Sequence, residues 1–194
     1  MAEAGRVISG SAAGRHLLAP GAGTRPFADR VKQTLFAILE PDLPGAAVLD
    51  LFAGSGAAGI EALSRGAARA TFVERDAGAV RTIRENLRRT GLEGPAAQIV
   101  QADVLTWLTR GGAAAGPFGI VIVDPPYAET ELLATVLARL GDGSLGSLAA
   151  DGRVVAKHFW RSAPPERVGL LASERVRRFG ETALTFYRAG GDDR

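Results

Sequence analysis

Short apolar runs alternate with helix-like stretches over most of this chain of 194 residues. Apolar and β-branched residues dominate positions 48–51, 70–73, 98–101 and 118–123, and a segment with the 3.6-residue period of a helix follows each run. Residues 60–64 are placed on the first of these helices. The predicted buried stripes of the next two are Val80, Ile83 and Leu87, and then Leu132, Leu133, Val136, Leu137 and Leu140. Strands that alternate with helices form parallel sheets, so the sequence predicts an α/β fold.

The end of the chain departs from this alternation. A fifth strand is predicted at 153–157, after a loop at 141–147. Residues 173–179 and 182–188 flank Gly180 and Glu181, which predicts an antiparallel pair. Residues 111–116 contain only glycine and alanine and are expected to form a flexible loop. We therefore expect a mostly parallel sheet of seven strands that ends in an antiparallel C-terminal strand.

A chain of this length with 46% hydrophobic residues can bury one core of ordinary size, and it is too short for two domains of typical size. We expect a single domain over 1–194 with its core at 46–188. Residues 1–45, here called the N-terminal extension, precede the alternating pattern. Within them, 6–9 and 15–18 predict a hairpin, and 29–39 predict a helix that ends before Pro41 and turns Val31, Leu35 and Ile38 inward.

The composition excludes several kinds of site. The chain has no cysteine, which excludes disulfides, thiolate metal ligands and a cysteine nucleophile. Its only histidines are His16 and His158, so a histidine-rich metal centre is not expected. No apolar run reaches membrane-spanning length and residues 1–6 lack the apolar core of a signal peptide, so we expect a soluble cytoplasmic protein. The formal charge of +2 is only a weak indication of a polyanionic partner.

Asp124, Pro125, Pro126 and Tyr127 directly follow the apolar run at 118–123. The prolines lack backbone N–H donors and confine Asp124 and Pro125 to extended conformations, so the strand ends in a stiff turn that is rich in acceptors. An exocyclic amine of a nucleobase can donate two N–H groups to a carboxylate and a carbonyl, while the tyrosine stacks on the base. The alternative is a rigid turn with a packed aromatic ring. Residues 124–127, here called the acceptor turn, therefore predict a site for a base amine.

A glycine-rich turn follows the first predicted strand of the core. Gly54, Gly56 and Gly59 match the dinucleotide-binding fingerprint, and Glu74 lies where that fingerprint has its ribose-binding acid. Asp50, however, comes just before the turn, where its carboxylate would repel a pyrophosphate. S-adenosylmethionine carries a cationic sulfonium and amino group and no phosphate. Asp50 therefore favours S-adenosylmethionine over NAD.

Acidic residues also follow the next two predicted strands. Glu74 could accept hydrogen bonds from both hydroxyls of a ribose, and Asp103 could accept from an adenine amine. Each has a simpler explanation, because an acid at a strand end can cap the next helix and glycines there can permit tight packing. All these acids and the acceptor turn nevertheless follow consecutive strands, at the carboxyl ends where open α/β sheets bind ligands. We therefore expect them to serve one binding site.

Basic residues gather in the N-terminal extension, which has few carboxylates. They are Arg6, Arg15, His16, Arg25, Arg30 and Lys32. Solvated surface charge and contact with phosphates both explain such a cluster. Two smaller groups are further candidates for contact with a nucleic acid, one made of Arg81, Arg84, Arg88 and Arg89, and one made of Arg175, Arg177 and Arg178.

Together these motifs resemble a known superfamily. Residues 50–59, Glu74, Asp103 and the acceptor turn are similar to the class I S-adenosylmethionine-dependent methyltransferases, in the form seen in enzymes that methylate exocyclic base amines. The segments 6–10, 14–15, 25–26, 29–36 and 180–184 resemble the bacterial RsmD family, and the resemblance spans nearly the whole chain. The sequence departs from that family at Phe27-Ala28, where a threonine usually follows the Arg-Pro pair.

The resemblance implies a Rossmann-like fold with helices on both faces of the sheet, and methylation of N2 of a guanine in 16S ribosomal RNA. It implies catalytic roles for Asp124, Pro125, Pro126 and Tyr127, cofactor contacts from Asp50, Phe52, Ala53, Gly54, Gly56, Glu74, Arg75, Asp103 and Val104, and RNA contacts from Arg6, Arg15, Arg25, Arg30 and Lys32. It further implies S-adenosylmethionine as cofactor, S-adenosylhomocysteine as product, no metal, no membrane, and a monomer that acts on an assembled or assembling small ribosomal subunit.

Three other functions stay open at this point. A DNA or RNA adenine-N6 methyltransferase would use the same acceptor turn. An NAD-dependent oxidoreductase would share the glycine fingerprint, although Asp50 disfavours it. A non-catalytic RNA-binding factor for ribosome assembly could keep the fold, although it would have no evident need for Asp124 beside an aromatic residue.

Overall fold

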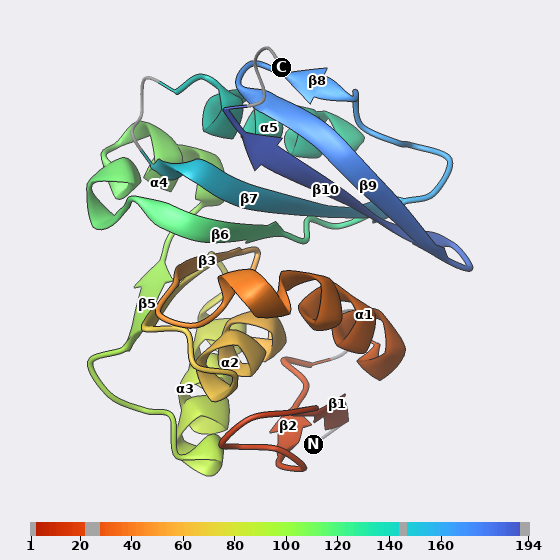
Figure 1. Ribbon diagram of the computed structural model, residues 1–194. Helices are drawn as coiled ribbons and strands as arrows, with labels where there is room; N and C mark the ends of the chain where they lie inside the picture. The colour runs from red at the N-terminus through yellow and green to blue at the C-terminus, as the bar shows by residue number, and fades with distance from the viewer. Residues whose placement is uncertain (1–2, 22–27, 144–146, 191–194) are drawn as a thin grey trace. The chain divides into compact units, whose positions relative to one another are not determined.

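The predicted alternation of strands and helices is present in the structure (Figure 1). The computed structural model describes residues 3–21, 28–143 and 147–190. The chain forms two compact units, Met1–Asp103 and Val104–Arg194, and each contains strands covered by helices. The α/β class predicted from the sequence is therefore confirmed.

Three parallel strands form the sheet of the first unit, in the order β5-β4-β3. They are β3 (Ala47–Leu51), β4 (Arg69–Glu74) and β5 (Ala97–Gln101), each within one residue of its predicted bounds. Helices α2 (Ala57–Ser64) and α3 (Ala77–Thr90) pack on these strands, and Val80, Ile83 and Leu87 are buried as predicted. Because the strands are parallel and in register, their carboxyl ends lie at one edge of this sheet.

The N-terminal extension contains the predicted hairpin and helix. Strands β1 (Glu3–Arg6) and β2 (His16–Leu18) are antiparallel, so the first strand of the hairpin begins three residues earlier than predicted. Helix α1 (Asp29–Leu39) has the predicted bounds and leads into the 3₁₀ turn η1 (Glu40–Asp42). Val31 and Leu35 are buried as expected, whereas Ile38 is half-buried.

Side chains of α2 and α3 hold the N-terminal extension against the rest of the first unit. Glu61 accepts backbone N–H groups from Ile8 at 2.7 Å and from Ser9 at 3.0 Å. Asn86 accepts from the N–H of Leu18 at 2.8 Å and donates to the carbonyls of Leu18 and Ser55 at 3.0 and 2.9 Å. Glu61 and Asn86 are fully buried, so these bonds are shielded from water. The extension is thus docked by specific buried contacts.

The second unit has five strands in the order β6-β7-β10-β9-β8. Strands β6 (Phe118–Val123) and β7 (Leu148–Phe159) are parallel, whereas β10 (Thr182–Ala189), β9 (Leu171–Phe179) and β8 (Arg167–Val168) continue the sheet in antiparallel fashion. The antiparallel pair at the end of the chain is confirmed. Helix α5 (Thr130–Gly141) packs on this sheet with Leu133, Val136, Leu137 and Leu140 buried, while Leu132 is half-buried.

Three details of the second unit differ from the prediction. Strands β3 to β10 number eight in the described part of the chain, where seven were predicted, because the two-residue strand β8 has no apolar signal of its own. Strand β7 begins at Leu148, five residues before the predicted start. The glycine-alanine segment predicted to be a loop contains the 3₁₀ helix η2 (Gly112–Ala115), which follows helix α4 (Val104–Thr109).

Candidate functional site

The turn between β3 and α2 has a strained backbone. Phe52 has a φ of 61°, which is rare for a bulky side chain, and Gly54 and Gly56 also have positive φ. The N–H of Ala53 donates to the carbonyl of Val73 at 3.2 Å, and the N–H of Gly56 donates to the carbonyl of Ala53 at 2.7 Å. These bonds fix a tight loop of residues 52–56, here called the glycine turn, at the carboxyl end of β3.

Gly59 and Asp50 join helix α2 to the strands. A Cβ atom at Gly59 would lie 2.3 Å from the ring of Phe72, so only glycine permits this approach of helix and strand. Asp50 is 2% exposed, and its Oδ2 accepts the N–H of Gly59 at 2.8 Å. The predicted helix-capping function of an acid at this position is therefore present. A carboxylate also places negative charge beneath the glycine turn.

Glu74, at the end of β4, connects two loops. Its Oε2 accepts the N–H of Gly54 at 2.9 Å, and its Oε1 accepts the N–H of Asp76 at 2.9 Å. Each carboxylate oxygen has a further lone pair, so these bonds leave capacity for a hydroxyl donor. Asp76, which the sequence did not single out, caps helix α3 by accepting the N–H of Ala79 at 2.7 Å.

The remaining predicted cofactor residues lie at or just after strand ends. Arg75 is exposed after β4, and Asp103 is exposed after β5. Val104 is buried and begins α4 in the second unit. In the first unit, then, three carboxylates from Asp50, Glu74 and Asp103 follow or end successive parallel strands. Such a set suits a cationic ligand with hydroxyl and amine donors better than one with phosphates, so it fits S-adenosylmethionine.

The acceptor turn of the second unit begins with an ion pair. Lys157, near the end of β7, donates from Nζ to Oδ1 of Asp124 at 2.6 Å and to Oδ2 at 2.9 Å. Burial raises the pKa of Asp124 above its ordinary value, and the ammonium of Lys157 acts in the opposite direction. The lysine therefore favours the charged carboxylate at a position where desolvation disfavours it.

Both the hydroxyl and the ring of Tyr127 have contacts with other strands. Its hydroxyl lies 2.6 Å from Oγ1 of Thr182, the first residue of β10, and the Lys157 ammonium lies 5.1 Å from the centre of its ring. The carbonyl of Pro126 accepts the N–H of Glu129 at 2.9 Å. These contacts hold the ring of Tyr127 in one orientation beside the carboxylate of Asp124.

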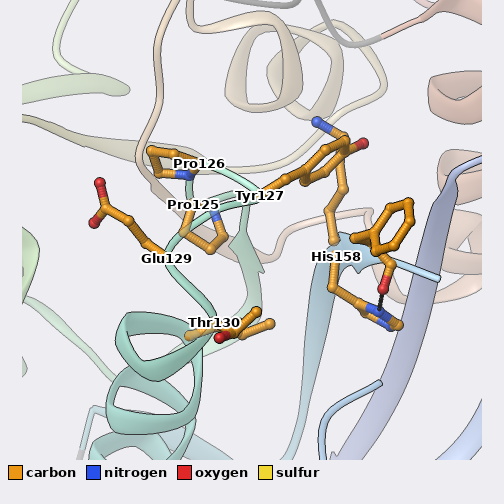
Figure 2. A pocket seen from close by; sticks show the side chains of 9 residues that line it. Pro125, Pro126, Tyr127, Glu129, Thr130 and His158 are labelled. Carbon is orange, nitrogen blue, oxygen red and sulfur yellow. Dashed lines mark hydrogen bonds between the residues drawn. The ribbon is translucent and has the colours of Figure 1, made fainter. Parts of the chain in front are cut away.

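A small pocket adjoins the acceptor turn (Figure 2). It is lined by Pro125, Pro126, Tyr127, Glu129, Thr130, Leu133, Lys157, His158 and Phe159. Burial lowers the pKa of His158, so its ring is neutral at pH 7. Its Nδ1 lies 2.9 Å from the carbonyl of Phe159, which can only accept, and its Nε2 lies 2.8 Å from the hydroxyl of Thr185. His158 is thus assigned a proton on Nδ1 and serves to fix the end of β7.

Sequence reasoning did not identify Lys157 or Thr182 as parts of this site. The signal for Lys157 is a charged residue at the end of an apolar strand, and the parallel pairing of Val123 with Ala156 brings it beside the acceptor turn. Thr182 becomes visible only through the register of β10 with β7, where it pairs with Phe159.

The basic residues of the N-terminal extension divide into two groups. Arg6, Arg15 and Arg30 are exposed, and Nε of Arg6 lies 3.8 Å from a carboxylate oxygen of Asp29. Lys32 is fully buried, lies 3.7 Å from Glu61 and donates to the carbonyl of Arg6. The expected phosphate contact of Lys32 is therefore contradicted, because its ammonium has no surface to offer. Arg25 and Phe27 lie outside the described residues.

Within residues 3–21, 28–143 and 147–190, no three His, Cys, Asp or Glu side chains cluster in a way that could hold a metal ion. In the same segments, each helix is too short or too polar to cross a lipid bilayer.

Comparison with known proteins identifies the family. The family model described as "Conserved hypothetical protein 95" matches residues 5–188. YlbH of Bacillus subtilis is 40% identical over 187 residues, which is 96% of this chain and 100% of the relative. The "Ribosomal RNA small subunit methyltransferase D" of Escherichia coli K12 is 42% identical over 132 residues, 68% of this chain and 64% of the relative.

Solved structures agree with these matches. The structure of yhhF from Escherichia coli has a TM-score of 0.84 and 32% identity, and the match covers 96% of this chain and 98% of that one. An RNA methyltransferase from Salinibacter ruber, solved with S-adenosyl-L-homocysteine, has a TM-score of 0.63 over 87% of this chain and 96% of its own. Its identity of 16% shows the class I methyltransferase fold alone. The chain belongs to the RsmD family of methyltransferases.

Proposed function

We propose that this protein methylates the exocyclic N2 amine of a guanine in small-subunit ribosomal RNA, with S-adenosylmethionine as the methyl donor. The observation that carries the proposal is the acceptor turn, where a half-buried carboxylate paired with Lys157 follows a strand and precedes two residues without N–H donors. The printed name of the Escherichia coli relative supports the coarser part, methylation of ribosomal RNA of the small subunit.

The first unit supplies residues that suit the cofactor. The glycine turn brings backbone close to a ligand without side chains in the way, and the carboxylates of Asp50, Glu74 and Asp103 complement cationic and hydrogen-donating groups. Glu74 is the proposed partner of the ribose hydroxyls, and Asp103 of the adenine amine. When bound, S-adenosylmethionine supplies a methyl group on a sulfonium and leaves as S-adenosylhomocysteine.

The second unit supplies acceptors for the amine. The lone pair of guanine N2 is delocalised into the ring, so the amine is a weak nucleophile until its two N–H bonds are held in a pyramidal arrangement. Asp124 is the proposed acceptor of one N–H group. The carbonyl of Pro126 already accepts from Glu129, so the carbonyl of Pro125 is the proposed acceptor of the other. With both N–H groups held in this way, the lone pair of N2 becomes available to attack the methyl carbon in an in-line displacement.

Charge changes during the transfer favour the same residues. The N2 lone pair forms the new N–C bond as the C–S electron pair returns to sulfur, so positive charge moves onto nitrogen. Asp124 stabilises that charge, and the ammonium of Lys157 favours the ionised form of the carboxylate. One N–H proton then leaves nitrogen, and Asp124 or a water molecule hydrogen-bonded to it is the proposed acceptor. Tyr127 stacks on the base, since its ring is held by Thr182.

The N-terminal extension is the proposed first RNA contact. Arg15 and Arg30 are exposed, and no ion pair is found for either among the described residues. Replacing both with glutamine should reduce the salt dependence of RNA binding, because each lost phosphate contact lowers the slope by about 0.7 to 0.9. An unchanged slope would remove the extension from the RNA-binding surface.

Incubation with labelled S-adenosylmethionine tests the proposal. Two substrates are compared, small ribosomal subunits and naked small-subunit RNA, both from cells that lack the modification. The labelled nucleotide is then mapped. Label on guanine N2 is expected, and label on adenine would assign the protein to the adenine-N6 class. Tight RNA binding without label would point to an assembly factor.

A further inference from the structure

We infer that Arg175 and Arg177 of strand β9 bind phosphates of the RNA strand that delivers its base to the acceptor turn. This inference rests on the proposed function, and it adds an RNA-binding surface in the second unit to the one proposed in the N-terminal extension. Figure 1 shows β9 and β10 as a long hairpin, with β9 on the side away from β7.

The strand register places both arginines on the same side of the sheet as Lys157. Lys157 pairs with Leu184 and Leu184 pairs with Arg177, so the three side chains form one cross-strand row. Arg175 pairs with Phe186 in the next row on that face. Directly paired residues point to the same face, and two strand spacings separate β7 from β9 by about 10 Å. Arg177 therefore lies two strands away from the lysine that holds Asp124, and Arg175 lies in the next row on the same face.

Neighbouring acidic side chains do not neutralise the positive charge of Arg175 and Arg177. Arg175 and Arg177 are exposed, and neither has a carboxylate partner among the described residues. The nearest acid in sequence, Glu174, is occupied, because Arg153 donates to its Oε2 at 2.6 Å and Arg188 donates to its Oε1 at 2.9 Å. Two guanidinium groups thus remain available to an external anion.

The spacing and chemistry of the pair fit a phosphodiester chain. Residues two apart on a strand are separated by about 7 Å and point the same way, which is comparable with the separation of neighbouring phosphates in an extended RNA strand. A guanidinium can donate two parallel hydrogen bonds to one phosphate.

The hairpin is held to the acceptor turn, so the arginines keep a fixed relation to Asp124. Thr182 hydrogen-bonds to Tyr127, and the N–H of Trp160, directly after β7, donates to the carbonyl of Glu181 at 3.0 Å. Arg178, on the opposite face of β9 from Arg177, lies over the Trp160 ring with Cζ 3.5 Å from its centre. Arg178 therefore supports the hairpin, while Arg175 and Arg177 are left for the ligand.

The double variant Arg175→Gln/Arg177→Gln tests the inference. Its matched control is Arg110→Gln/Arg139→Gln, which removes two exposed arginines from the ends of α4 and α5 in the same unit. With unmodified small subunits as substrate, the test variant should raise KM for RNA about tenfold or more, because charge-assisted phosphate contacts are lost. Its kcat at saturating substrate and its affinity for S-adenosylhomocysteine should stay near wild type.

The salt dependence separates phosphate contacts from other effects. The slope of log K against log salt should fall by about 1.4 to 1.8 for the test variant, and by much less for the control. An unchanged KM and slope, with new self-association in sedimentation, would show that these arginines only protect an exposed strand edge and would overturn the inference. If wild-type protein transfers no methyl group to any RNA, the proposed function fails instead.

Discussion

Lys157 bridges both oxygens of Asp124, with Nζ at 2.6 Å from Oδ1 and 2.9 Å from Oδ2. Asp124 directly follows β6 and Lys157 lies in β7, and the parallel pairing of these two strands sets the residues side by side. An unpaired carboxylate at this buried position would tend to take up a proton, and a protonated carboxyl accepts hydrogen bonds poorly. By opposing protonation of Asp124, Lys157 therefore favours the form of the acceptor turn that accepts hydrogen bonds.

Replacement of Asp124 by asparagine should lower kcat about a thousandfold, because the amide keeps the shape and loses the charge that stabilises the transition state. The affinity for S-adenosylhomocysteine, measured by calorimetry, should stay within about twofold of wild type, since one acceptor is removed from the RNA side alone. A variant that transfers methyl groups at a near-normal rate would refute the assigned function of Asp124.

The pH dependence of the reaction should show the raised pKa of Asp124. Because burial raises this pKa, the carboxylate becomes protonated at a higher pH than an ordinary aspartate, and kcat/KM should fall on the acid side correspondingly early. Lys157→Met removes the group that opposes this shift, so its acid limb should move to still higher pH. Lys157→Arg keeps the charge and serves as the control. Profiles of kcat/KM from about pH 4 to 9 would show at which pH the acid limb of each of the three proteins lies. An acid limb of Lys157→Met at the same pH as that of wild type would contradict the prediction.

Gly59→Ala should destabilise the first unit by about 1 to 3 kcal/mol, the usual cost of overpacking. The new methyl group would lie 2.3 Å from the ring of Phe72, which is fully buried. Urea unfolding measures the effect. The double variant Gly59→Ala/Phe72→Leu should recover part of the loss, and strict additivity of the two changes would argue against a direct clash.

Glu61→Gln should destabilise the protein by about 3 to 5 kcal/mol, because it leaves the buried ammonium of Lys32 with only the half-buried carboxylate of Asp29, 3.9 Å away, as an anionic partner. The same change weakens the bonds to Ile8 and Ser9, so limited proteolysis should cut the N-terminal extension faster. Glu61→Gln/Lys32→Met removes both charges and should regain stability. Equal stability of the single and double variants would show that the pair is not coupled.

Much of the fold could be predicted because its signals are local. The apolar run at β6 and the helix α1 have the predicted bounds, and Gly59 serves the packing function that its place in the fingerprint implies. The acids at or near the ends of β3 and β4, Asp50 and Glu74, were found for the same reason, since a charged residue within or at the end of an apolar run is visible in the sequence itself.

The residues that were missed depend on contacts between distant segments. Lys32 has the sequence context of a surface helix, and only the approach of Glu61 from α2 explains its burial. Lys157 contacts Asp124 through the register of two strands separated by a helix. The strand β8 is two residues long and forms because β9 offers an edge, which no local propensity encodes.

The side-chain amide of Asn86 binds two different segments of the backbone. Its nitrogen donates both to Leu18, at the end of the N-terminal hairpin, and to Ser55, in the glycine turn. Both of its N–H donors, and one lone pair of its oxygen, are directed at backbone, so no rotation satisfies one segment while releasing the other. The hairpin and the glycine turn therefore cannot be redesigned or exchanged separately, and a chimaera that borrows either segment must also carry the asparagine between them.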